Sequence, residues 1–82
     1  MVGAKVHQRI LHALADTLTD DADYVFTGIE VHKGWGGVIS VTIYGETESG
    51  VPGAPGRTLV HAVEEAIGPE RQHVKLETAR RA

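Results

Sequence analysis

Apolar residues recur at every fourth position near the start of the chain. The stripe consists of Val6, Ile10, Leu14 and Leu18, with Leu11 and Ala13 beside it, and polar residues occupy the other side. This spacing is typical of an amphipathic helix that buries one face. Three aspartates follow between residues 20 and 23, and negative charge is unfavourable at the C-terminal end of a helix. We therefore predict a helix over about residues 4–19.

Two segments after this helix have the pattern of strands joined by a tight turn. Residues 24–32 (YVFTGIEVH) are rich in β-branched and aromatic residues, which strands favour. In residues 38–46, Ile39, Val41 and Ile43 alternate with Ser40, Thr42 and Tyr44, the period of a half-buried strand. The connection KGWGG supplies the glycines that a hairpin turn needs. The sequence therefore predicts a β-hairpin of strands 24–32 and 38–46.

The remainder of the chain adds a loop, a second helix and a third strand. Residues 47–56 (TESGVPGAPG) are rich in glycine and proline and predict a loop. Residues 57–67 contain a second apolar helical face, and Gly68 followed by Pro69 is a typical helix stop. Residues 72–78 predict a strand with Val74 and Leu76 on one side.

The order α-β-β-α-β leads to a specific architecture. We expect one α+β domain over residues 1–82, a two-layer sandwich in which both helices cover one face of a three-stranded sheet. A right-handed crossover through the second helix makes the third strand parallel to the second. We place the strand 24–32 in the middle of the sheet, because it is the most apolar. The other face of the sheet is then open.

Polar side chains are expected on this open face. They are Glu30, His32, Ser40, Thr42, Tyr44, His73, Lys75 and Glu77. Such a face can be simply solvated, or it can serve self-association or ligand binding. The strand containing Thr42 and Tyr44 carries little charge, and we expect its edge to pair with a second copy, since unpaired edges must be protected or used.

The only tryptophan of the chain, Trp35, lies between glycines in the predicted turn. Two interpretations stand side by side. The indole can fold back and close a small core, or it can reach outward as a contact anchor that offers much area with few rotamers to immobilise.

Composition narrows the classes of function. The chain has no cysteine, which excludes disulfides, thiol catalysis and cysteine-bound zinc. The net charge is −3 and the basic residues are scattered, so no nucleic-acid partner is expected. No apolar run approaches the length of a membrane span, and the N-terminus lacks the apolar core of a signal peptide. We therefore expect a cytoplasmic protein without a transmembrane segment.

Two further sets of residues are candidates for chemistry. His32 and His73 are expected on neighbouring strands of the open face, where two histidines and a carboxylate could hold zinc. The same histidines could serve as bases in a small enzymatic site at a subunit interface. Arg57 follows the glycine-rich loop at a helix N-terminus, a position that can contact an anion. No nucleophile with a neighbouring base is evident in the sequence, which favours a non-enzymatic role.

Part of this pattern resembles a known module. The stretch GVISVTIYG, then Ser49, then Arg57 leading RTLVHAVEEAIG, is similar to the BON domain, a phospholipid-associated module of bacterial envelope proteins. The resemblance implies an anionic phospholipid as partner. The loop before Arg57 is longer than in that pattern, and GPERQHV replaces its GV. In topology only, the chain also resembles the scaffold domain of NifU-like proteins and the cytoplasmic domain of cation-diffusion transporters.

These observations give one leading hypothesis and two alternatives. The leading hypothesis is a small non-enzymatic module that forms a homo-oligomer through its open face or an edge strand, with Trp35, Thr42 and Tyr44 as binding residues. One alternative is a zinc or enzymatic site at His32 and His73, with zinc the only cofactor considered. The other is an anionic phospholipid module that uses Arg57 and Trp35.

Overall fold

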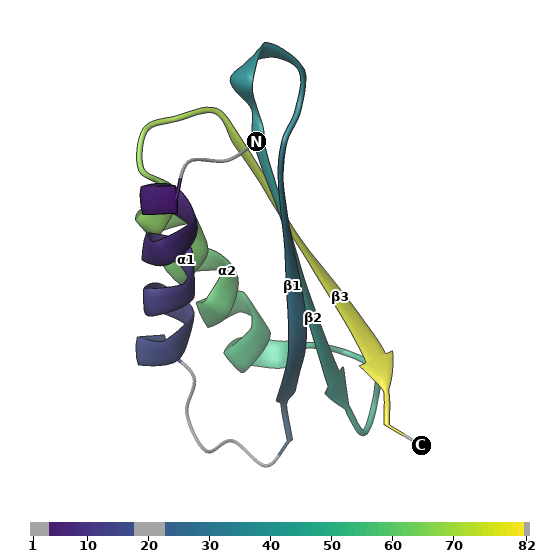
Figure 1. Cartoon of the computed structure of the whole chain (residues 1–82). Helices are drawn as coiled ribbons and strands as arrows, with labels where there is room; N and C mark the ends of the chain where they lie inside the picture. Colours follow the sequence, from purple (N-terminus) through teal and green to yellow (C-terminus); the bar gives the residue numbers. More distant parts are fainter. Residues whose placement is uncertain (1–3, 18–22, 82) are drawn as a thin grey trace.

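The computed structural model describes residues 4–17 and 23–81, and it has the predicted order of elements. The elements are α1 (Ala4–Thr17), β1 (Val25–Lys33), β2 (Ile39–Thr47), α2 (Gly53–Ile67) and β3 (Gln72–Arg80). Both helices lie on one side of the three-stranded sheet, and the other side of the sheet is uncovered (Figure 1). The predicted α+β class, with both helices on one face, is confirmed.

The strand order differs from the prediction. β2 lies in the middle, antiparallel to β1 on one side and parallel to β3 on the other. The placement of the strand 24–32 in the centre was therefore wrong. The hairpin pairs β1 with one edge of β2, and the crossover through α2 brings β3 to the other edge. Apolar content does not decide this order, because a strand at an edge can be as apolar as a central strand if one side of it meets helices.

The burial of β2 reflects its central position. Its alternate residues Ile39, Val41 and Ile43 are almost inaccessible to solvent, whereas Ile29 of β1 and Leu76 of β3 are only partly buried. The core is completed by Ile10 and Leu14 of α1 and by Leu59, Val63 and Ile67 of α2. The described residues thus share one core, which positions the open face and the two sheet edges.

β1 and β2 each lie one residue later than predicted, and the start of α2 differs more. α2 begins at Gly53 and not at residue 57, because a helix tolerates proline in its first turn and Pro55 occupies that turn. The N–H of Gly56 donates to the C=O of Pro52 at 3.4 Å. The predicted loop 47–56 shortens accordingly. α2 ends as predicted, where Gly68 adopts a positive φ of 82° and its N–H donates to the C=O of Glu64.

The third strand extends beyond the predicted range 72–78. β3 continues to Arg80, which pairs with Thr47 of β2. The N–H of Arg81 then donates to the C=O of Thr47 at 2.7 Å. For the first helix, residues 18 and 19 of the predicted range 4–19 lie outside the described residues.

Candidate interaction surfaces

The open face of the sheet carries the predicted polar side chains in rows across the three strands. One row places Glu30 beside Thr42 and Thr42 beside Lys75, and the next pairs Tyr44 with Glu77. Neighbours in a row point to the same face of the sheet. The polar side chains predicted for the open face therefore share that face on all three strands. On β1 the alternation changes phase at the register shift between Phe26 and Gly28, because Phe26 before the shift and Ile29 after it both pack against the core although they are three positions apart.

Hydrogen bonds and ion pairs join many of these side chains. The hydroxyl of Tyr44 donates to Glu30 Oε1 at 2.7 Å, and Glu30 Oε2 lies 3.3 Å from His32 Nε2. Lys75 Nζ lies 2.8 Å from Glu77 Oε1. The bond from Tyr44 and the contact with His32 hold the pKa of Glu30 below its ordinary value. The same bond raises the pKa of Tyr44, and Glu77 raises the pKa of Lys75. The face is thus polar, with positive and negative groups close together.

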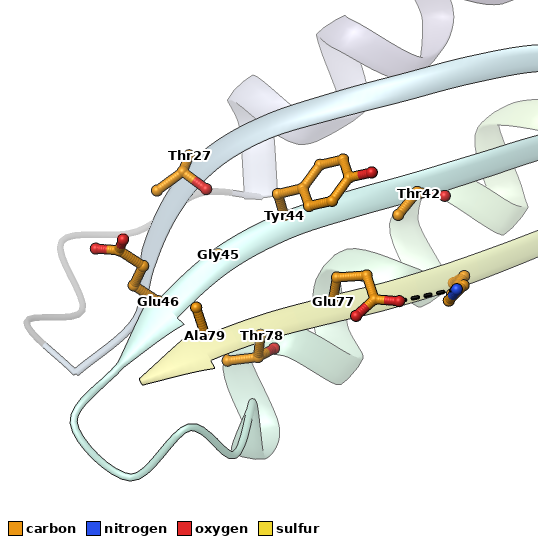
Figure 2. Close-up of a pocket in the computed structure, with 9 residues that line it drawn as sticks. Thr27, Thr42, Tyr44, Gly45, Glu46, Glu77, Thr78 and Ala79 are labelled. Atoms are coloured by element: carbon orange, nitrogen blue, oxygen red, sulfur yellow. Dashed lines mark ion pairs between the residues drawn. The ribbon is translucent and has the colours of Figure 1, made fainter. Parts of the chain in front are cut away.

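A shallow hollow of about 380 Å³ lies on this face near the ends of β2 and β3 (Figure 2). Tyr44 and Thr42 border it from β2, and Lys75 and Glu77 border it from β3. Its lining offers hydroxyl, carboxylate and ammonium groups. Such a set can form polar contacts with another surface.

The two histidines of the zinc hypothesis are not on neighbouring strands. His32 on β1 and His73 on β3 both pair with Ser40 of β2, which lies between them. Two strand spacings, about 9.5 Å, separate their backbones. This corrects the predicted adjacency, which depended on the wrong strand order. Residues 4–17 and 23–81 contain no group of three histidine, cysteine, aspartate or glutamate side chains that could hold a metal ion. Zinc binding itself stays a prediction.

Trp35 lies at the tip of the β1–β2 hairpin with 99% of its surface exposed. The interpretation that it closes a core was therefore wrong, and the contact anchor remains. The turn is closed by the N–H of Gly34, which donates to the C=O of Val38 at 2.7 Å. Gly36 has a positive φ of 69°, which suits glycine. A short 3₁₀ turn, Trp35–Gly37, holds the indole away from the sheet.

Basic side chains accompany the tip. A Cβ atom built on Gly36 would lie 3.8 Å from Nη1 of Arg71, and one built on Gly37 would lie 4.0 Å from Cε of Lys33. The hairpin tip that carries the exposed indole therefore has an arginine and a lysine beside its glycines. Arg71 was not a predicted site residue, and the signal for it is absent from the sequence because about thirty-five positions separate it from the turn.

Arg57 lies far from Trp35 in the fold (Figure 1). It is exposed and belongs to the first turns of α2. That end of α2 lies at the end of the molecule opposite to the hairpin tip (Figure 1), and the longest extent of the fold is 37 Å. The two residues therefore do not form one local site, and their combination in one lipid contact stays a prediction.

The two edges of the sheet belong to β1 and β3. The expectation that the strand 38–46 offers a free edge was wrong, because β2 has a neighbour on each side. The β1 edge is interrupted by the register shift between Phe26 and Gly28, and bulges are one way in which proteins protect an edge. The pairing of β3 with β2 is regular from Gln72 to Arg80. β3 therefore offers the more regular edge.

Comparison with protein-family models, with curated proteins and with solved structures gives no match for this chain. The resemblance to the BON domain thus rests on the residues quoted for it and finds no support in these comparisons. Among the described helices, none has the length and apolar character needed to cross a membrane.

Proposed function

We propose that this chain is a non-enzymatic assembly module of the cytoplasm that self-associates through an exposed edge of its sheet. The observation that supports this most directly is the position of β3, a nine-residue strand that pairs regularly on one side and, among the described residues, has no neighbouring strand on the other. Its outer row of backbone N–H and C=O groups is a template for another strand. Proteins commonly use such an edge to bind an extended segment.

The polarity of the open face favours the edge over the face. Stacking two copies face to face would remove the Glu30–Tyr44 and Lys75–Glu77 pairs from water, and the desolvation of charged groups opposes this. Pairing of edges keeps those side chains at the surface. It also supplies partners to backbone groups that otherwise bond only to water.

The same threonine-to-lysine change at two positions distinguishes self-association through the sheet edge from self-association through the open face. Thr78→Lys places a charge on the edge strand β3, and Thr42→Lys places the same charge in the middle of the open face on β2. We expect Thr78→Lys to weaken self-association and Thr42→Lys to leave it unchanged. The measurement is molar mass by light scattering on a sizing column over a range of protein concentrations.

The controls and the contrary outcomes are clear. The thermal unfolding of each variant shows that it is folded, and Ala79→Lys, at an exposed position of the same strand, replaces Thr78→Lys if that variant does not fold. A loss of association in Thr42→Lys alone would assign assembly to the face. A wild-type chain that stays monomeric at the highest concentration would overturn the proposal.

Anionic phospholipid is a second candidate partner, and the fully exposed Trp35 supports it. Indole rings are enriched at the interface between membrane and water, and cationic side chains such as Lys33 and Arg71 near the tip are attracted to anionic headgroups. One indole and two cations give weak binding on their own.

Tryptophan emission tests this candidate directly, because Trp35 is the only tryptophan. We expect a blue shift with vesicles that contain phosphatidylserine and none with vesicles of phosphatidylcholine alone. Lys33→Glu should reduce the shift, and Arg57→Glu, at the opposite end of the fold, should not. Emission that is unchanged at high lipid concentration would contradict lipid binding by the tip.

A further inference from the structure

The free edge of β3 exposes the backbone groups of its even-numbered residues. The N–H of Ile39 on β2 donates to the C=O of Arg71 at 2.9 Å, just before β3 begins. Peptide groups along a strand alternate between its two sides, so odd-numbered residues of β3 bond to β2. The groups of Val74, Leu76 and Thr78 then point outward. In an antiparallel pair of β3 strands, these N–H and C=O groups find hydrogen-bond partners only if even-numbered residues of one copy lie opposite even-numbered residues of the other.

The charged side chains of β3 favour one of these registers over the others. Lys75 and Glu77 are exposed on the open face, two positions apart, with Leu76 between them on the helix side. In an antiparallel pair of identical strands, a two-fold axis at Leu76 places each Lys75 opposite Glu77 of the other copy. Opposite charges in this position are favourable, and like charges are unfavourable.

We infer that two copies pair β3 with β3, antiparallel and about a two-fold axis at Leu76, so that the two sheets form one six-stranded sheet. This inference rests on the proposed self-association and names its register. An axis at Lys75 would set two lysines against each other, and an axis at Glu77 would do the same with two glutamates. These are the next permitted registers on either side, and charge disfavours both.

The helix side of the same register is also complementary. Leu76 meets Leu76 of the second copy, and Val74 lies opposite Thr78. All three residues are only partly buried in the single chain, so a second copy covers apolar surface that water now contacts. The hydroxyl oxygen of Thr78 is buried without a hydrogen-bond partner, and the register brings the backbone of the second copy alongside this residue. Closed two-fold pairing also leaves each copy with one free edge among its described strands, that of β1.

Charge exchange tests the register in four samples. Lys75→Glu alone sets two glutamates opposite each other in every such cross-strand pair, and Glu77→Lys alone sets two lysines there. Each dimer contains two of these pairs, so we expect either variant to self-associate roughly tenfold or more weakly than the wild type. An equimolar mixture of the two variants should form a heterodimer. One of its cross-strand pairs joins the introduced glutamate to the introduced lysine, and the other joins the native Glu77 to the native Lys75. Both pairs are therefore opposite in charge. The double variant, with Lys75→Glu and Glu77→Lys together, should recover the self-association of the wild type.

The design separates the register from general charge effects. Lys75→Glu makes the chain more negative than its charge of −3, and Glu77→Lys makes it less negative. Net repulsion would weaken only the first variant, whereas the register weakens both. Sedimentation equilibrium gives the association constants, and thermal unfolding confirms that the variants are folded.

Each outcome has a distinct meaning. Loss in both single variants with recovery in the mixture and in the double variant supports the axis at Leu76. Four samples that associate like the wild type would overturn the register and leave the proposed self-association intact. A wild-type chain without self-association would overturn both.

Discussion

A single methyl group added at Gly45 tests how Tyr24 closes the core. The Tyr24 ring, with 6% of its surface exposed, lies directly over Gly45 of β2. A Cβ atom built on Gly45 would lie 2.8 Å from Cε2 of Tyr24 and still nearer to Cζ and the hydroxyl oxygen. Gly45 is required here because the ring occupies the space of a side chain. Gly45→Ala must therefore displace a buried ring.

Two opposing effects determine how much Gly45→Ala changes the free energy of unfolding. Replacing glycine by alanine inside a strand stabilises by about 0.5–1 kcal/mol, because the unfolded chain loses freedom. Overpacking a buried site costs about 1–3 kcal/mol. The cost of overpacking is the larger of the two, and we expect a net loss of about 1–2 kcal/mol in the free energy of unfolding. For a domain of this size, the midpoint of thermal unfolding falls by roughly 4–8 °C for each 1 kcal/mol lost.

Gly28→Ala is the matched control on the neighbouring strand. A Cβ atom built on Gly28 has no atom within 4 Å, and the φ of Gly28 is not positive, so this variant should equal or slightly exceed the wild type in unfolding temperature. The cost of Gly45→Ala should disappear in a Tyr24→Leu background, where the ring is absent. Equal unfolding temperatures for Gly45→Ala and Gly28→Ala would refute the reasoning, as would an unchanged cost in that background.

Three further predictions concern a loop, a carboxylate and zinc. Thr47→Val should cost about 1–3 kcal/mol in urea unfolding, because the buried hydroxyl of Thr47 bonds two backbone groups of the following loop; a cost near zero would contradict this. Tyr44→Phe should raise the pKa of Glu30 toward its ordinary value, measured by NMR titration of its carboxyl carbon. Since the wild-type pKa is lowered, the stability that Glu30 contributes is present above its unfolded-state pKa and is lost as the pH falls through its folded-state pKa; the variant should lose less stability on acidification. Zinc should leave the unfolding temperature unchanged, and a rise that His73→Ala abolishes would instead establish the zinc alternative.

The sequence alone determined most of the local structure and the class of fold. Strict alternation in Ile39–Thr47 and the four-residue spacing of Ile10 and Leu14 predict which side of each element is buried. These signals are local, because the positions along one strand or one helix turn set the direction of each side chain. The outward set of side chains, including Glu30 and Lys75, was predictable for the same reason.

Only the tertiary structure decided which strand lies in the centre of the sheet. The strand order in turn decided which candidate residues lie at an edge and which lie next to one another. The central position of β2 removed the predicted edge at Thr42, separated His32 from His73 by Ser40, and made β3 an edge. The burial of Trp35 was equally undetermined, since a glycine-rich turn permits an indole to fold back or to point outward. Strand order and the placement of a turn side chain depend on contacts between residues far apart in the chain. The local pattern of residues within one helix or strand does not predict those contacts.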